Sequence, residues 1–541
     1  MTKEGLTAVG FLTYESAPAF DRAFRVLDPG PLPLLWFGLY RDAEPMLPPA
    51  HLDPHMDCEW EPSLDSAGYH SRHERIKDYI AGGDTYQVNF TMQLDAAFDG
   101  DPRRLFAQLL ASQPRGYAAY LDTGDHVLCS ISPELFFRLS GDRIVCRPMK
   151  GTSPRGVTLD DDRRRIQWLR NSSKNRAENI MIVDMIRNDL GRIAEIGSID
   201  VTRLCDIEQY RTLFQMTSTV EARTGAPLSD IFRALFPCAS ITGAPKIRTM
   251  QIISELEDRP RGIYTGCIGT IGPGREAQFN VAIRTVHIDR RHGRAAYGTG
   301  GGIVWDSDPE DEYRECSTKA LILRRPPPAF QLLETLRWDP GRGFALVDRH
   351  LSRIRQSAAF FDFTLDQDGL RDRLRVEEGR FGDVPHRVRV LVGPDGETAV
   401  ASTPIPGVPF QTDPNPTDDR WSVAVSRTPV DSTNYFLYHK TTVRAVYDEA
   451  RAVHPDADDV LLWNQKNEVT ESTIANVVAR IGGDFVTPPV SCGLLAGTFR
   501  EELLERGTIA ERVITIDELR HASDVYVINS VRGWIPVHVL P

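Results

Sequence analysis

The stretch Tyr297-Gly-Thr-Gly-Gly-Gly-Ile303, followed by Glu312-Tyr-Arg-Glu315, decides how the first half of the chain is interpreted. The glycine run exposes successive backbone N–H groups, as an anion nest does, although such a run taken alone is more often a turn. In the second segment two acids stand three residues apart, so on a helix both side chains face the same way. Packing alone demands neither composition, and we therefore expect a functional site here.

Outward from this stretch, other segments of the first half carry equally unusual residues. Ser132-Pro-Glu134 leads into an apolar run, Lys150 stands beside a glycine after a predicted strand, and Ile241-Thr-Gly-Ala-Pro-Lys246 is a small-residue turn. Glu178 lies on a helix predicted over 176–190 by its apolar spacing. Two helices that each supply one carboxylate suit Mg²⁺, which keeps waters and usually takes one or two protein carboxylates. Any one of these acids alone also fits a solvated helix surface.

Composition excludes several classes of protein. The chain has 541 residues, of which 63 are basic and 75 acidic, and its net charge of -12 argues against nucleic-acid binding. A hydrophobic fraction of 41% suits large cores and excludes global disorder. We find no apolar run that approaches a transmembrane helix and no secretory signal, so we expect no membrane association. The eight cysteines are scattered without a CxxC pair, as in reduced cytoplasmic proteins.

Helical and strand patterns interleave in both halves, which predicts an α/β or α+β fold. A helix is expected to end at Ala81, before a strand over 86–90. The proline triplet Pro326–Pro328 lacks backbone donors and blocks a helix, so it predicts a short stiff linker. The linker would divide the chain into domains 1–325 and 326–541.

The segments of the first half, in this order from about residue 70 to 325, resemble the chorismate-utilising enzymes. That family includes anthranilate synthase, isochorismate synthase, salicylate synthase and aminodeoxychorismate synthase component I. The resemblance implies an anthranilate synthase-like chorismate-binding domain in which Glu178 and Glu315 bind Mg²⁺, with Glu312 as a supporting acid. It also implies that Glu134 protonates the departing C4 hydroxyl of chorismate. The residues that it implies for substrate binding are Gln87, Thr242, Lys246, Tyr264, Arg284, Gly300, Gly301 and Lys319.

The residues at two positions distinguish between the members of this family. Members that add water are similar but carry a lysine base where this chain has Gln87, which favours a member that adds ammonia. Anthranilate synthases have alanine where this chain has Lys150, whereas the matching lysine of aminodeoxychorismate synthases is a nucleophile that attacks C2 of chorismate. Such a lysine must be partly neutral, and Lys246 is a candidate for a cationic neighbour that lowers its pKa. Anthranilate synthase and a plain surface lysine are the alternatives.

The second half has a lysine of its own. Lys440 is expected at the start of a helix, and Glu471 lies in the strand and turn predicted for Glu468-Val-Thr-Glu-Ser-Thr-Ile-Ala-Asn476. Gly493-Leu-Leu-Ala-Gly-Thr-Phe-Arg500 is a small-residue loop before a helix expected from near Glu501, and a helix N-terminus after such a loop is a natural phosphate site. An aldehyde cofactor needs a lysine, an acid for its pyridine nitrogen and a phosphate site. Taken alone, Lys440 would be a surface lysine.

As an ordered set, the segments of residues 330–541 resemble the fold-type IV pyridoxal-phosphate enzymes. These include branched-chain and D-amino-acid aminotransferases and 4-amino-4-deoxychorismate lyase. The resemblance implies that Lys440 bonds covalently to pyridoxal 5′-phosphate and that Glu471 pairs with the pyridine nitrogen. It implies that Arg353 binds the phosphate, together with the backbone N–H groups of Thr498 and Phe499. The domain begins late relative to the family, so an inactive docking module stays open, as does a homodimer through this domain.

Together the two resemblances imply a bifunctional cytoplasmic enzyme of 4-aminobenzoate, and hence folate, biosynthesis. The first domain would aminate chorismate through Lys150, and the second would eliminate pyruvate from 4-amino-4-deoxychorismate with Lys440 as acid and base. No GxCxGxQ glutaminase signature occurs in the chain, so a separate glutamine amidotransferase subunit would supply the ammonia. The alternative for the second domain is a D-amino-acid or branched-chain aminotransferase.

Overall fold

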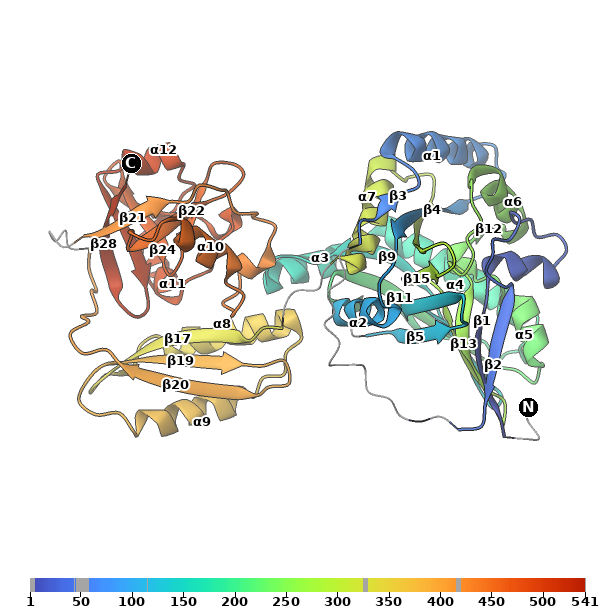
Figure 1. Ribbon diagram of the computed structural model, residues 1–541, viewed down its shortest axis with the longest axis horizontal. Coiled ribbons are helices and arrows are strands. Elements are labelled where there is room, and N and C mark those ends of the chain that lie inside the picture. The colour runs from blue at the N-terminus through green and yellow to red at the C-terminus, as the bar shows by residue number, and fades with distance from the viewer. Residues whose placement is uncertain are drawn as a thin grey trace. The chain divides into compact units, whose positions relative to one another are not determined.

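The computed structural model describes residues 5–42, 44, 58–113, 115–324, 329–414 and 420–540. The chain forms two units, Met1–Arg155 with Arg165–Pro327 and Gly156–Arg164 with Pro328–Pro541. Figure 1 follows the chain through both units by colour. The second unit thus includes a short segment of the first half, which the sequence did not indicate. The predicted linker Pro326–Pro328 lies outside the described residues. No helix within the described ranges is both long and apolar enough to cross a membrane.

The larger sheet of the first unit is antiparallel and has the strand order β10-β11-β8-β7-β14-β13-β1-β2, with β9 paired to β11. Its strands are β1 (Thr7–Leu12), β2 (Leu35–Tyr40), β7 (Leu135–Ser140), β8 (Arg143–Arg147), β9 (Met149–Pro154), β10 (Asp200–Gln209), β11 (Leu213–Arg223), β13 (Cys267–Gly272) and β14 (Glu276–Val281). The helices α4 (Ser173–Gly191) and α5 (Leu228–Leu235) share its core, to which α4 contributes Ile182 and Ile186. Glu178 lies one turn before Ile182 on the same side of α4.

The second sheet of the first unit is also antiparallel, with the order β12-β4-β16-β15-β6-β5 and β3 paired to β4. Its strands are β3 (Glu61–Pro62), β4 (Gln87–Ala97), β5 (Tyr117–Asp122), β6 (His126–Ser132), β12 (Gly243–Ala244), β15 (Thr285–Asp289) and β16 (Arg294–Ile303). The helices around it are α1 (Ser66–Ala81), α2 (Pro102–Ser112), α6 (Lys246–Leu256) and α7 (Pro309–Lys319). The predicted helix end at Ala81 and the predicted strand that follows are confirmed.

Strand β16 contains the glycine run and pairs with β4 along its whole length. The expected anion nest is therefore wrong, because successive N–H groups of an extended strand point in opposite directions. Helix α7 follows β16 and contacts it. The side chain of Asp308 caps α7 by accepting hydrogen bonds from the backbone N–H groups of Glu310 and Asp311, both at 3.0 Å. This cap fixes where the helix starts, and so fixes the direction in which Glu312 and Glu315 point.

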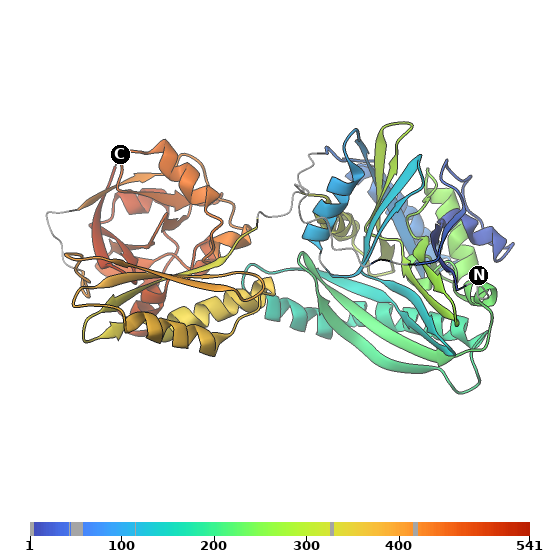
Figure 2. The ribbon, with the colours of Figure 1, turned by 60° about the horizontal axis from the view of Figure 1, so that its bottom comes forward.

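The second unit has a small and a large sheet. The small sheet has the order β18-β17-β19-β20, and the large one β23-β22-β21-β28-β27-β24-β25-β26. Figure 2 shows α8 (Val347–Phe361) and α9 (Gln367–Glu378) along one face of the small sheet. The small-sheet strands are β17 (Leu332–Asp339), β18 (Gly343–Phe344), β19 (His386–Val392) and β20 (Thr398–Pro404). Those of the large sheet are β21 (Trp421–Val425), β22 (Asp459–Trp463), β23 (Val469–Ser472), β24 (Asn476–Ile481), β25 (Asp484–Thr487), β26 (Ala510–Glu511), β27 (Asp524–Asn529) and β28 (Gly533–Val539).

The remaining elements connect these sheets. They are α3 (Leu159–Asn171), α10 (Ala445–Val453), α11 (Thr498–Glu505), α12 (Ile516–Arg520) and the 3-10 turns η1 (Tyr14–Ala19), η2 (Ala239–Ile241), η3 (Ala320–Leu323), η4 (Tyr435–Leu437) and η5 (Val490–Cys492). The sheets are antiparallel except for parallel pairs in the large sheet of the second unit, and with the packed helices they make the chain a mixed α/β protein, as predicted.

Candidate active sites

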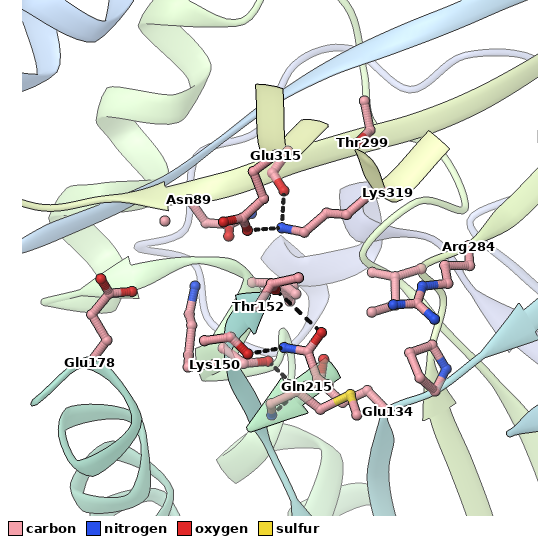
Figure 3. Close-up of a pocket in the computed structure, with 18 of the residues that line it drawn as sticks. Asn89, Glu134, Lys150, Thr152, Glu178, Gln215, Arg284, Thr299, Glu315 and Lys319 are labelled. Carbon is pink, nitrogen blue, oxygen red and sulfur yellow. Dashed lines mark hydrogen bonds and ion pairs between the residues drawn. The ribbon is translucent and has the colours of Figure 1, made fainter. Parts of the chain in front are cut away.

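The first candidate site is a cavity of about 110 Å³ in the first unit. Strand β9, helix α4, helix α7 and the glycine strand β16 bring its polar side chains together, as Figure 3 shows. The predicted residues that line it are Glu134, Lys150, Glu178, Tyr264, Arg284, Gly300, Glu312, Glu315 and Lys319. Gln87, Thr242, Lys246 and Gly301 are not among the lining residues.

Lys150 extends from β9 into this cavity and is buried. Burial lowers the pKa of its ammonium group, while the carboxylate of Glu178 opposes this effect and the ammonium of Lys319 adds to it. Lys246 does not have the expected role of cationic neighbour, because its Nζ lies 2.8 Å from the carboxylate of Asp189, outside the cavity lining. Lys319 on α7 is the cation that acts on Lys150.

Glu134 is buried and forms two hydrogen bonds within the cavity wall. Its Oε1 accepts one from the hydroxyl of Ser240 at 2.6 Å and one from the backbone N–H of Met149 at 3.4 Å. Burial nevertheless raises the pKa of this carboxyl to about 7. A large part of the Glu134 population is therefore protonated at neutral pH, which a general acid requires.

Three carboxylates face the cavity from α4 and α7. Oε1 of Glu312 accepts from the hydroxyl of Ser307 at 2.7 Å and lies 3.2 Å from Nζ of Lys174. Oε1 of Glu315 lies 2.6 Å from Nζ of Lys319. Sequence reasoning missed Lys174, which lies two residues before the helix predicted over 176–190, whereas the observed α4 includes it.

Glu178 differs from the other two acids because its carboxylate has no hydrogen bond or ion pair to another described residue. Burial raises its pKa to about 7, and the charges of Glu312 and Glu315 add to this rise. No group of three His, Cys, Asp or Glu side chains in the described part of the chain is close enough to enclose a metal. Mg²⁺ needs only one or two protein carboxylates and keeps its waters, so this donor set fits that ion.

Two cations also line the cavity, Arg284 at the end away from Glu178 and Lys319 beside Glu315 (Figure 3). Arg284 is buried, holds a left-handed backbone with φ of 50°, and lies with its guanidinium 5.2 Å from the centre of the Tyr210 ring. Nη1 of Arg284 donates to Oε1 of Gln113. Nζ of Lys319 donates to the carbonyl of Gly300 at 2.8 Å. These two cations are placed to bind an anionic group of a ligand.

The glycines of β16 make room for the residues around them. A Cβ on Gly302 would lie 2.6 Å from Nζ of Lys150 and would also collide with the amide of Gln87. Gln87 is fully buried, and neither its Nε2 nor its Oε1 has a hydrogen-bond partner among the described residues. Gln87 thus lies next to Lys150 without lining the cavity. Thr242 has a structural contact instead, because its hydroxyl donates to the carbonyl of Cys238 at 3.2 Å.

The second candidate site is a cavity of about 550 Å³ in the second unit, within the usual range for a cofactor pocket. All five residues predicted for the cofactor line it: Arg353, Lys440, Glu471, Thr498 and Phe499.

Lys440 is not at a helix start as predicted, because α10 begins only at Ala445. Its segment instead joins the small sheet, where the backbone N–H of Leu333 donates to the carbonyl of Lys440 at 2.9 Å. Burial, together with the charge of Arg353, lowers the pKa of Lys440 to about 8. A lysine with this pKa is partly neutral at physiological pH, as bonding to an aldehyde requires.

Glu471 extends from β23 into the same cavity. The hydroxyl of Tyr447 donates to its Oε1 at 2.7 Å, and Nδ2 of Asn476 lies 3.5 Å from its Oε2. Burial raises the pKa of Glu471 to about 8. A protonated pyridine nitrogen beside Glu471 would offset the cost of burying a negatively charged carboxylate. Glu471 therefore fits the acid that pyridoxal phosphate needs.

A chain of hydrogen bonds joins the two parts of the expected phosphate site. Arg353 donates from Nε and Nη2 to the carboxylate of Glu334, at 2.8 and 2.6 Å. Nδ1 of His350 lies 2.7 Å from the same carboxylate, and its Nε2 lies 3.2 Å from the hydroxyl of Thr498. Thr498 begins α11, three residues before the predicted start near Glu501. Glu334 and His350, which sequence reasoning missed, thus connect Arg353 with the first turn of this helix.

Comparison with known proteins gives one family match for each unit. The model of the chorismate binding enzymes matches residues 1–325, and that of the class IV amino-transferases matches residues 331–540. Aminodeoxychorismate synthase component 1 of Bacillus subtilis is 40% identical over 260 residues, which are 48% of this chain and 55% of that protein. Aminodeoxychorismate synthase of Streptomyces griseus is 41% identical over 281 residues, 51% of this chain and 38% of that protein. The matches thus span about half of these relatives or less.

Among solved structures, anthranilate synthase component I from Streptococcus pneumoniae superposes with a TM-score of 0.52 at 26% sequence identity. The alignment covers 59% of this chain and 81% of that chain. The predicted anthranilate synthase-like fold of the first domain and the class IV aminotransferase-like second domain are both confirmed. Since the chorismate-binding model covers more than half of the sequence, the chain belongs to the family of chorismate binding enzymes.

Proposed function

We propose that the first unit aminates chorismate to 4-amino-4-deoxychorismate and that the second unit converts this product to 4-aminobenzoate and pyruvate. The observation that carries the proposal is the buried Lys150, which faces Glu178 across a cavity that also holds the protonatable Glu134. The relatives named as aminodeoxychorismate synthases support the first reaction. Ammonia would come from a separate glutamine amidotransferase.

In the first reaction Lys150 and Glu134 have complementary roles. The neutral amine of Lys150 attacks C2 of chorismate, both ring double bonds shift by one position toward C4, and the C4 hydroxyl leaves as water with the proton of Glu134. Ammonia then attacks C4, both double bonds shift back, and the amine of Lys150 leaves C2. Glu178 and Glu315 would hold Mg²⁺, which neutralises the ring carboxylate, while Arg284 and Lys319 are available for the second carboxylate.

In the second reaction the cofactor, when bound through Lys440, supplies an electron sink. Glu471 would stabilise positive charge on its pyridine nitrogen, and Arg353 with the start of α11 would hold its phosphate. Lys440, once free of the cofactor, takes the proton from C4 of the substrate. The C3–O bond then breaks, pyruvate leaves, and the ring becomes aromatic.

Replacing Lys150 tests the nucleophile. We expect the amination rate of Lys150→Ala to be more than roughly a hundredfold lower than that of the wild type, because the variant lacks the amine proposed to attack C2 of chorismate. Mass spectrometry of wild-type protein quenched during turnover with chorismate and ammonia should show an adduct on the peptide that contains Lys150. Lys466→Ala, which removes an exposed lysine, is the matched control. An unmodified peptide together with a near-normal rate in Lys150→Ala would return Lys150 to a structural role.

The pKa of Glu134 predicts how the amination rate depends on pH. At equal concentrations of neutral ammonia, we expect the amination rate to fall as pH rises above about 7, because Glu134 then loses the proton that it must donate. In Glu134→Gln the rate should be lower by roughly a hundredfold and this alkaline decline should disappear. An identical decline in the Gln variant would assign the acid to another group.

The metal site can be tested by direct binding. We expect Glu315→Gln to weaken Mg²⁺ binding, measured by calorimetry, by at least roughly tenfold, since one of the two carboxylate ligands is lost. Glu310→Gln on the exposed side of α7 is the control. Equal Mg²⁺ affinity in the wild type and both variants would contradict the proposed ligand.

Replacing Lys440 separates the two reactions. We expect Lys440→Ala to lose the visible absorbance of the lysine-bound cofactor and the release of 4-aminobenzoate, while 4-amino-4-deoxychorismate accumulates. The reason is that the two lysines act on different bonds in different cavities. Formation of 4-aminobenzoate by the variant would show that the second unit is not the lyase. If the wild type exchanges amino groups between amino acids and 2-oxoglutarate, the second unit is an aminotransferase.

A further inference from the structure

The small sheet of the second unit has two different faces. Along β19 the side chains of His386, Val388, Val390 and Val392 are buried against α8 and α9. Arg387 and Arg389 alternate with them and therefore project from the opposite face. A strand with one apolar face and arginines on the other would normally present those arginines to bulk water.

Here the arginine face is exposed to solvent and also lines the cavity of Lys440. Arg387 and Arg389 are both lining residues of that cavity. Arg389 pairs across the sheet with Thr335 and Ala401, and Arg387 pairs with Thr403 and Arg337. The small neighbours of Arg389 leave its guanidinium group uncovered.

Arg337 on β17 provides a contrast, because it projects from the same face but is fully engaged. It donates to both carboxylate oxygens of Asp339, at 2.8 and 2.7 Å, and to the carbonyls of Val408 and Val531. Neither Arg387 nor Arg389 has a hydrogen-bond acceptor or an acid within bonding distance among the described residues. Both side chains are exposed to the solvent of the cavity, so their guanidinium groups are available to an anionic ligand.

Strand register places these arginines relative to Lys440. Leu333, which donates its backbone N–H to the carbonyl of Lys440, pairs with Leu391 on β19. Arg389 is two residues along the strand from Leu391, about 7 Å, and Arg387 is two residues farther. Strand β17 lies between Lys440 and β19, which adds two strand spacings, about 10 Å across the sheet. An anion bound by Arg389 would thus lie across the cavity from the backbone of Lys440.

We propose that Arg389 and Arg387 form a carboxylate subsite, so that the second cavity selects a ring-shaped amine that carries two carboxylates. The inference rests on the proposed lyase reaction, whose substrate has one carboxylate on the ring and one on the side chain. A guanidinium binds a carboxylate through two parallel hydrogen bonds, which gives both affinity and orientation. A branched-chain amino acid has a single carboxylate and lacks the second one that the proposed substrate carries.

The first test measures turnover. In Arg389→Gln and Arg387→Gln we expect KM for 4-amino-4-deoxychorismate to rise at least roughly tenfold, with kcat within about threefold of wild type. The affinity for pyridoxal phosphate and its visible absorbance should not change, and Arg389→Lys should recover part of the loss. Arg342→Gln, at an exposed turn of the same sheet, is the matched control. Unchanged KM in both variants would overturn the subsite.

The second test does not need the lyase reaction. Calorimetry with the holoenzyme should show that isophthalate, a ring with two carboxylates, binds at least roughly tenfold tighter than benzoate, and that Arg387→Gln/Arg389→Gln removes this difference. Equal affinities, or no binding of isophthalate to the wild type, would overturn the subsite. If the preference depends on the arginines but the wild type does not consume 4-amino-4-deoxychorismate, the lyase proposal fails and the carboxylate subsite stands.

Discussion

The cost of removing a lysine ammonium from water is the constraint on which both sites depend. A buried ammonium loses its hydration and its pKa falls, unless opposite charges compensate. Among the charged neighbours, the largest effect on the pKa of Lys150 is that of Glu178, which opposes the fall, whereas the largest effect on Lys440 is that of Arg353, which increases it. The same side chain is thus prepared for bond formation in two different electrostatic settings. In the first setting, binding of Mg²⁺ to Glu178 would remove part of the compensation and favour the neutral amine of Lys150 further.

In each site a glycine stands at a point where no side chain would fit. A Cβ on Gly302 would displace Lys150, and a Cβ on Gly497 would collide with Oδ1 of Asn476. Asn476 donates to the carbonyl of Leu495 at 2.8 Å, so it holds the loop that leads into α11. At both positions the glycine is required by a close contact rather than by backbone conformation, since Gly497 has an ordinary φ of -69°.

Features that depend on local spacing could be predicted from the sequence. Features whose structure depends on contacts with distant parts of the chain were predicted wrongly. The three-residue spacing of Glu312 and Glu315 placed both on one side of α7, since helix geometry follows directly from spacing. The position of Lys440 was wrong because its backbone bonds to Leu333, more than a hundred residues away in the chain, and this strand contact replaces the expected helix. The glycine run was misread for the same reason, since pairing with β4 keeps it extended.

Charged neighbours were the least predictable part of the sites. Lys319 stands one turn from Glu315, so helical spacing pointed to it. Lys174 lies before the helix predicted over 176–190 and pairs with Glu312 on another helix, so it was missed. Glu334 and His350 gave no such signal, because they come from β17 and α8 and meet only after the sheet has formed. Lys246 was assigned to Lys150 although it pairs with Asp189, since a sequence records the charge of a residue but not its partner.

In the proposed reactions, the two cavities would bind one molecule at different stages of its conversion. Amination leaves both carboxylates of chorismate in place and exchanges a hydroxyl for a primary amine at C4. The first cavity has charges of both signs, Glu178 and Glu315 for a metal and Arg284 and Lys319 for anions. The second cavity has Lys440 for the cofactor that would take up the new amine, with Arg387 and Arg389 on its other side. A compound that still carried the hydroxyl would find cations for its carboxylates in either cavity. Only the aminated product could react at the aldehyde, so the order of the two proposed reactions follows from the amine and not from the carboxylates.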